Sequence, residues 1–258
     1  MLGDSSSRIL SAGPRRNVLK LLLCVLLLSA VLSALAASER GPEPFFPIAE
    51  GTTWVYQGVV RWKRFGYEGA KEREVIWKME TGQVIRHGAL VAAVLKGFPA
   101  DLNWTTGNPD PRDSLLVVNG GSRYYFVNPL HFRSAWIRVQ AELEPLKGLM
   151  TETDLLFQLP LTQGAKFCGA DVIDREENAS MFCWHVGPEL PVDLKGIKGI
   201  PPGKRPSYDI HYLTVVDETE VQIVPGIGIT RYEYHRHTSP TDTILNLTEF
   251  QPATRKPR

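Results

Sequence analysis

The segment Glu233-x-His235-x-His237 places a carboxylate and two imidazoles at alternate positions of a predicted β-strand. Alternate residues of a strand project from the same face, so the three side chains would lie together. Such a set can bind zinc or copper when a further ligand approaches, and His211 and Glu249 are the candidates for that role. Glu233, His235 and His237 are therefore the predicted metal ligands. The competing interpretation is a solvent-facing polar stripe on a strand whose other face packs inward.

Two cysteines, Cys168 and Cys183, lie outside the N-terminal apolar segment and are predicted to form a disulfide. Residues 167–173 and 179–186 have the composition of two strands, and the polar stretch 174–178 between them is typical of a turn. Folding about that turn places the cysteines opposite each other. An even number of cysteines in an oxidising compartment also favours a disulfide. A metal site made by the two thiols and a nearby histidine is the alternative, but the closely spaced ligand pairs of zinc motifs are missing.

The standard signatures of catalysis and nucleotide binding do not occur in the sequence. We find no Gly-x-Ser-x-Gly, no His-Glu-x-x-His, no P-loop and no dinucleotide fingerprint, so no cofactor is predicted. The formal net charge is +1, and the first 36 residues hold four basic residues and one acidic residue, which leaves about −2 for the remainder. Without a basic field, nucleic acid is excluded as a partner.

An apolar run, LLLCVLLLSAVLSALAA at 21–37, follows a basic stretch near the N-terminus. Small residues at its end suit cleavage, so residues 1–36 are predicted to be a secretory signal peptide and 37–44 a linker. Because the run is also close to the lower length limit of a membrane span, an uncleaved N-terminal anchor is the alternative. The sequence RRNVLK at 15–20 resembles a twin-arginine export signal, which leaves the export route open.

The segment 45–253 has the alternating apolar pattern of short antiparallel strands. The sequence Asn119-Gly120-Gly121-Ser122, between two apolar runs, is typical of a hairpin turn. Strands are expected at 54–62, 72–80, 84–85, 89–95, 115–118, 124–127, 208–216, 221–224, 227–235 and 243–250. This series predicts an all-β fold, either an antiparallel sandwich or a curved, half-barrel-like sheet. Residues 254–258 are expected to form a frayed tail.

Helix is scarce in this pattern, and the one candidate lies at 134–143. Long loops are expected at 98–113 and at 187–206, where Pro, Gly and polar residues are frequent. Asp101 and the other acidic residues of the first loop are expected to belong to a solvated turn.

A faint internal repeat of the form Pro-apolar-x-x-Gly-x-x-aromatic occurs at 47–54 and again at 160–167. In each copy Pro fixes the chain entry, Gly allows a tight turn, and the aromatic side chain enters the core. The repeat indicates two β subregions with similar openings, 45–157 and 158–253. Chance similarity is the alternative for a pattern with four fixed positions.

The opening FFPIAEGTTWVY at 45–56 resembles the "YFPL-x-x-G-x-x-W-x-Y" motif that begins many exported bacterial proteins and lipoproteins. The later VPGIGITRY at 224–232 resembles their "APGVGLVKYE" segment. The resemblance implies a β-rich exported protein, in some members with a half-barrel sheet like that of periplasmic lipid carriers. The activity of such proteins is generally unknown, so the resemblance supplies no catalytic residue.

Three functions follow from these observations. The first is an exported, non-catalytic β-domain, periplasmic or extracellular, that binds an envelope component or an apolar small molecule in a concave sheet. It would contact a membrane only if its N-terminal segment stayed uncleaved. The second is a secreted metal-dependent hydrolase that uses Glu233, His235 and His237. The third is a structural or assembly module of the cell envelope. The missing catalytic motifs favour a protein that is not an enzyme.

Overall fold

A computed structural model describes residues 45–63, 69–103, 110–141, 155–168, 181–237 and 241–254. The predicted signal peptide, the linker and nearly all of the tail lie outside the described residues. The described residues belong to one compact unit, Pro44–Arg258.

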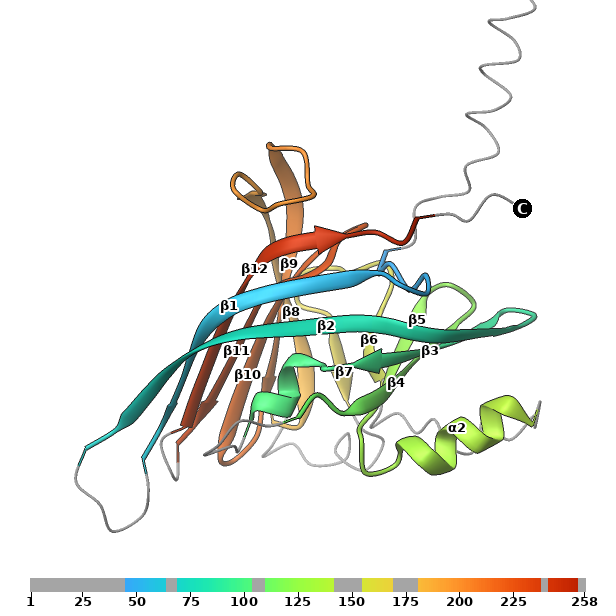
Figure 1. The fold of residues 1–258 in the computed structure, drawn as a ribbon, viewed down its shortest axis with the longest axis horizontal. Helices are drawn as coiled ribbons and strands as arrows, with labels where there is room; N and C mark the ends of the chain where they lie inside the picture. The colour runs from blue at the N-terminus through green and yellow to red at the C-terminus, as the bar shows by residue number, and fades with distance from the viewer. Residues whose placement is uncertain are drawn as a thin grey trace, which may run out of the picture. The chain divides into compact units, whose positions relative to one another are not determined.

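Twelve strands of this unit form a single antiparallel sheet, and one helix and one 3-10 turn interrupt their sequence (Figure 1). The strands are β1 Thr53–Trp62, β2 Lys71–His87, β3 Leu90–Lys96, β4 Asp113–Asn119, β5 Arg123–Val127, β6 Leu155–Gln158, β7 Lys166–Cys168, β8 Cys183–Asp193, β9 Lys204–Leu213, β10 Asp217–Val224, β11 Gly228–Arg236 and β12 Thr241–Gln251. The 3-10 turn η1 is Pro99–Leu102, and the helix α2 is Phe132–Gln140. The all-β prediction is confirmed.

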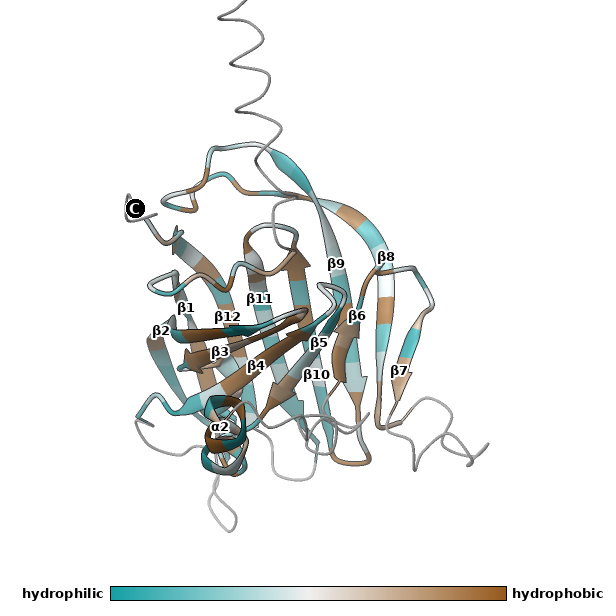
Figure 2. Ribbon diagram, turned by 90° about the vertical axis from the view of Figure 1, so that its right-hand side faces the viewer, coloured by the Kyte–Doolittle hydropathy of each residue, from teal (hydrophilic) through white to brown (hydrophobic). Residues whose placement is uncertain are grey.

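The sheet curves around a common interior and is nearly closed (Figure 2). Its strand order is β6-β5-β4-β3-β2-β1-β12-β11-β10-β9-β8-β7, so the first strand pairs with the last. β6 and β7 are the two ends of the order, and they approach each other without pairing. Of the two predicted arrangements, the curved sheet is therefore the one that the protein adopts.

The core lies on the inner face, where alternate residues of β1 and β2 meet those of β11 and β12. Trp54 and Tyr56 are fully buried there. The Trp54 indole N–H donates to the carbonyl of Ile227 at 2.6 Å, and the Tyr56 hydroxyl donates to that of Ile229 at 3.1 Å. These bonds satisfy polar atoms that would otherwise be costly to bury. They also link the opening motif of the chain to the start of β11.

The two copies of the predicted repeat have the same local structure. Gly51 and Gly164 both have positive φ, at 87° and 81°, and each lies in a tight turn directly before a strand, β1 or β7. Trp54 and Phe167 then both belong to the inner-face cluster. The predicted boundary near 157 coincides with the end of β6. Two subregions of common origin stay a prediction.

The connection between β3 and β4 was expected to be a solvated loop, and this is wrong for its first half. Asp101 is only 2% exposed, and its carboxylate accepts the backbone N–H of Arg112 at 2.9 Å and the Arg112 Nε–H at 3.1 Å. Burial raises the pKa of Asp101, although the bonds from Arg112 oppose that shift. Phe98 and Leu102 of this connection join the inner-face core.

The prediction of a loop at 187–206 is wrong for half of that segment, because residues 187–193 and 204–206 extend β8 and β9 into a long hairpin. β7 pairs with residues 183–185 of β8, and Val186 bonds to Gly164 and Ala165, but beyond Val186 no strand of the described residues pairs with that edge of β8. Proline is tolerated on such an edge, which explains a proline-rich strand here. The hairpin tip packs against β12, where the Lys198 backbone N–H donates to the Thr248 carbonyl and the Lys198 carbonyl accepts the backbone N–H of Phe250, both at 2.9 Å.

Two local predictions are confirmed. The Asn119–Ser122 turn joins β4 to β5, and both of its glycines have positive φ, as this turn requires. The helix predicted at 134–143 is α2, which packs Ala135 and Val139 against Leu115 and Val117 of β4 in a second, smaller core.

The disulfide prediction agrees with the structure, which places Cys168 opposite Cys183 with an S–S distance of 2.09 Å. Replacing both cysteines with serine is expected to lower the free energy of unfolding by about 3 kcal/mol, because the bridge restricts the unfolded chain. Urea denaturation of the oxidised protein and the double variant measures this loss. A reductant should reproduce it in the wild type and leave the variant unchanged; equal stability of both oxidised proteins would contradict the prediction.

Gly58 of β1 lies close to the backbone of β12. A Cβ at this position would lie 1.8 Å from the backbone oxygen of Ile244. We expect Gly58→Ala to destabilise the fold by about 3 kcal/mol, because backbone atoms must shift to admit the methyl group. Gly82→Ala in β2 is the matched control, since its nearest neighbour would be at 3.6 Å. Urea midpoints that fall equally in the two variants would contradict this account of the β1–β12 contact.

Candidate ligand-binding face

Strand register places one residue from each of eight neighbouring strands in a single line across the inner face. We call this line the aromatic row, because four of its members carry aromatic rings. From β7 through β12 to β1 and β2, its members are Phe167, Trp184, Tyr212, Thr219, Tyr234, Thr243, Val60 and Arg73.

The rows on either side of the aromatic row differ sharply in polarity. The deeper row is apolar apart from one tyrosine hydroxyl, and it consists of Val186, Ile210, Val221, Tyr232, Leu245, Gly58 and Val75. The row nearer the strand ends is mostly polar, and it consists of Asp217, Arg236, Thr241, Trp62 and Lys71. The inner face therefore changes from apolar through aromatic to charged along the strands.

Accessibility divides the aromatic row into two parts. Tyr234 and Thr243, on β11 and β12, are buried. On β7 to β10 the row is only half-buried, and this part, which we call the open aromatic segment, consists of Phe167, Trp184, Tyr212 and Thr219. The rings of Trp184 and Tyr212 are 5.0 Å apart, centroid to centroid. The open aromatic segment thus places three half-buried rings on neighbouring strands, with the hydroxyl groups of Tyr212 and Thr219 among them.

The buried tyrosines around this segment act as neutral hydroxyl groups. Tyr232 accepts the amide N–H of Asn103 at 2.7 Å, and Tyr234 donates to the carboxylate of Asp217 at 3.1 Å. Burial raises the pKa of both phenols above the usual range, and the negative charge of Asp217 raises that of Tyr234 further. Phenols with raised pKa values are poor nucleophiles and poor bases at neutral pH. This environment suits hydrogen bonding to a ligand.

Two buried polar atoms beside the row have no hydrogen-bond partner within the described part of the chain. They are the Thr243 hydroxyl and the side-chain oxygen of Asn103. Such atoms are uncommon in folded proteins because leaving them unpaired costs free energy. They mark the interior next to the aromatic row as more polar than a packed core requires.

The predicted metal ligands lie on the opposite, outer face, and each has its own environment. Glu233 is buried and pairs with Arg231. The two ring nitrogens of His235 face Glu233 at 3.5 Å and Asp242 at 3.1 Å. His237 is exposed at the end of β11. The structure therefore brings two of the three predicted ligands together, in a network with an arginine.

The residues suggested as further ligands are engaged elsewhere. His211 faces Glu220 at 3.8 Å, and Glu249 pairs with Lys198 at 3.1 Å. Across the described ranges, no group of three or more His, Cys, Asp and Glu side chains could hold a metal ion. A metal site at Glu233, His235 and His237 stays a prediction.

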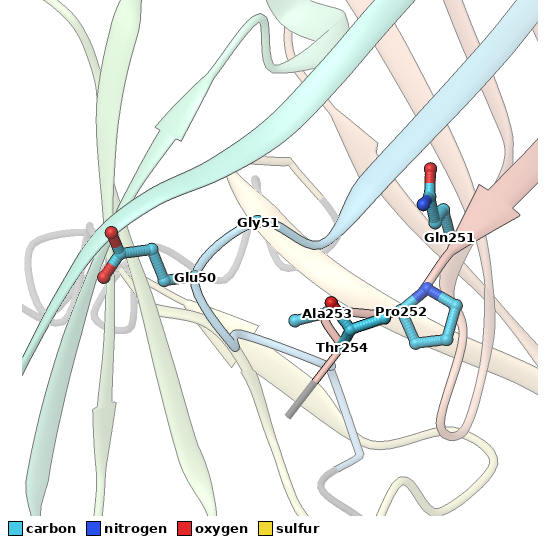
Figure 3. A pocket seen from close by; sticks show the side chains of 6 residues that line it. All are labelled: Glu50, Gly51, Gln251, Pro252, Ala253 and Thr254. Atoms are coloured by element: carbon cyan, nitrogen blue, oxygen red, sulfur yellow. The ribbon is translucent and has the colours of Figure 1, made fainter. Parts of the chain in front are cut away.

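A surface depression of about 500 Å³ lies where the turn before β1 meets the end of β12 (Figure 3). Glu50 and Gly51 line one side, and residues 251–254 line the other. Among the described residues that line it, Glu50 is the only ionisable side chain, and no histidine, lysine or cysteine accompanies it. The depression therefore offers less binding chemistry than the inner face.

The open aromatic segment was not predicted from the sequence. Trp184 and Tyr212 come from strands that the alternating pattern indicates, but their alignment with Phe167 and Thr219 depends on register. The cysteine pair carries the one local signal, because Cys168 opposite Cys183 fixes Phe167 opposite Trp184.

The pH dependence of stability should report the outer-face network. Burial of the His235 ring lowers its pKa, but hydrogen bonds to Asp242 and Glu233 outweigh this effect and raise the pKa above its usual value. A raised pKa in the folded state stabilises the fold below the unfolded-state pKa, and this stabilisation is lost as the pH rises through the folded-state pKa. His235→Gln should therefore lose more stability at about pH 5.5 than at about pH 8.5.

Urea denaturation of wild type and variant at the two pH values measures that difference. His237→Gln, at the exposed end of the same strand, is the control. An NMR titration of His235 should also show its pKa falling in Asp242→Asn. A loss in His235→Gln that is the same at both pH values would show that the imidazole charge does not stabilise the fold.

Within the described residues, no helix is both long and apolar enough to cross a membrane. No protein-family model matches the sequence, and no curated protein matches it. Among solved structures, the chain is similar to a Bacteroides fragilis NCTC 9343 protein described as exported and as having a YmcC-like fold, with 11% identity, a TM-score of 0.37, and coverage of 80% of this chain and 98% of that one. It is also similar to a Parabacteroides distasonis ATCC 8503 protein described as a lipoprotein, with 12% identity, a TM-score of 0.34, and coverage of 82% and 100%.

Proposed function

We propose that this protein is an exported, non-catalytic binding domain that holds an amphipathic small molecule against the open aromatic segment. The observation that carries the proposal is the gradient of the inner face, from apolar through aromatic to charged. An apolar portion of the ligand would lie on Phe167 and Trp184, and a polar portion would face Arg236 and Asp217 at the strand ends. Ligand sites commonly combine such an apolar surface with a few placed polar groups.

The ionisable groups near the aromatic row support a function in binding without catalysis. The phenols of Tyr232 and Tyr234 are held in the neutral form, as described above. The imidazole and carboxylate groups of the Glu233 and His235 network lie on the outer face, away from the interior. The metal-dependent hydrolase of the sequence analysis would need a ligand set and a cleft on that outer face, and no observation favours it.

Export is supported by two features of the chain itself. Residues 1–36 have the sequence of a signal peptide, and the Cys168–Cys183 pair is at bonding distance. Disulfides persist mainly in oxidising compartments. We therefore place the domain in the periplasm or outside the cell, free if the segment is cleaved and anchored if it stays.

Assembly by strand addition is less favoured than ligand binding. β6 and β7 have free edges, but they contain four and three residues. The free edge of β8 is longer, but Pro188 and Pro191 interrupt it. Short strands and edge prolines are devices that discourage pairing with another chain.

The binding test uses 1-anilinonaphthalene-8-sulfonate, a small amphiphile with an apolar ring system and an anionic group. We expect saturable binding with increased fluorescence, and displacement by dodecanoate. Trp184→Ala should weaken binding about tenfold, because it removes an aromatic contact and its buried area. The matched control is Trp136→Ala, since Trp136 is also half-buried but lies on α2, away from the inner face.

Urea denaturation of both variants confirms that each is folded at the temperature of the assay. Equal affinity of the Trp184 and Trp136 variants would rule out the open aromatic segment as the site. Probe binding that dodecanoate cannot displace would rule out an amphipathic ligand class.

A further inference from the structure

The outer side of α2 carries apolar side chains that the fold does not use. Ile137 is 56% exposed, and Leu130, directly before the helix N-cap, is 84% exposed. The packing of the helix on the sheet comes from its other side, where Ala135 and Val139 are buried against β4. Ile137 is two positions from both Ala135 and Val139, so it projects from the opposite side of the helix, and Leu130 adds an exposed side chain just before the helix begins. The side chains of Leu130 and Ile137 therefore do not contribute to the core.

Arginines flank these apolar side chains. Arg133 and Arg138 are exposed, and neither forms a hydrogen bond or ion pair within the described part of the chain. Residues 128–140 contain no acidic residue. Within residues 128–140, the positive charge of this side of α2 is therefore not neutralised.

Arg133 also lies where a cation does not help the helix. It is in the first turn of α2, and the positive end of the helix dipole disfavours a cation there. His131, the N-cap residue, makes no side-chain capping bond. Arg138, in the last turn, is placed favourably. Arg138 thus stabilises the helix through its position, whereas the position of Arg133 gives the helix no such stabilisation.

We propose that the outer side of α2, made by Leu130, Arg133, Ile137 and Arg138, docks on an anionic lipid surface. Exposed aliphatic side chains beside unpaired cations are typical of helices that lie in the interface of a bilayer. The arginines would contact lipid phosphates while Leu130 and Ile137 enter the headgroup boundary. The half-buried Trp136, stacked on Phe132 at an interplanar angle of 12°, packs against the smaller core instead and is not part of this surface.

A lipid surface fits these observations better than an acidic protein does. Nine residues of helix are about 14 Å long, which is short for a stable protein interface of roughly 800 Å² per partner. Two apolar side chains and two charges are sufficient for weak, reversible membrane binding. This inference goes beyond the proposed function, because docking would bring the domain to a bilayer whether or not its inner face holds a ligand.

The test is co-sedimentation of the protein, isolated from the exported fraction, with vesicles of phosphatidylcholine containing about one-third phosphatidylglycerol. We expect binding to these vesicles, weak binding to pure phosphatidylcholine, and release at high salt, because screening weakens surface attraction. Arg133→Gln combined with Arg138→Gln should reduce partitioning by about fivefold for each arginine. Ile137→Asn should reduce it in both low and high salt.

Matched controls separate this surface from general charge and exposure. Lys195→Gln with Lys204→Gln removes two exposed cations from the β8–β9 hairpin, and Ile76→Asn alters an aliphatic residue that is 77% exposed on β2. Both controls should partition within about twofold of the wild type. Equal losses in the α2 and control variants would overturn the proposal. Failure to bind vesicles, together with arginine-dependent binding to poly-L-glutamate, would overturn it in favour of an acidic protein partner.

Discussion

The pairing of β1 with β12 is the contact on which the rest of the structure depends. Every other neighbouring pair in the sheet is formed by strands that follow one another in the chain. β1 and β12 are separated by nearly the whole domain, so joining them has the largest entropic cost of any pairing. Trp54 and Tyr56 support this contact through their hydrogen bonds to the β10–β11 region, and Gly58 allows the two backbones to approach. Without the β1–β12 pairing, the protein would consist of two six-stranded meanders with no shared interior.

The same contact determines the inner-face gradient. The aromatic row passes from Thr243 on β12 to Val60 on β1, so its continuity requires the observed register. A shift of one residue would turn the inner-facing side chains of one half toward solvent. The pairing skips Thr248 of β12 between Val55 and Tyr56, so Phe250 and Leu247 both contribute to the inner core although they are three positions apart. The candidate site and the fold are therefore parts of one arrangement.

The local sequence was sufficient to predict those parts of the fold that depend on interactions between residues close in the chain. The alternation of β2, the glycine turn at 120–121 and the cysteine pair each depend on residues that are close in the chain. The burial of Asp101 could not be predicted, because its partner Arg112 and its position under the sheet come from tertiary packing. The strands in 187–206 were missed because proline usually marks loops, whereas an unpaired strand edge tolerates it. The open aromatic segment depends on register among strands that no local signal aligns, apart from the cysteines.

The number of strands offers a physical reason for an accessible site inside the sheet. About eight strands make a barrel whose interior side chains can fill, and a larger number leaves space. Here twelve strands curve around the interior, and the chain adds filling from two segments, the opening Phe45–Ile48 and the Phe98–Asn103 connection. Phe45 lies between Phe157 on β6 and Tyr208 on β9, at ring distances of 5.5 and 6.1 Å, and so fills the gap between the two ends of the sheet. In the described part of the chain, the ring contacts of these two segments do not include Phe167, Trp184 or Tyr212 of the open aromatic segment. A narrower barrel would need less filling from other segments, so the wide sheet is compatible with the ligand binding proposed above.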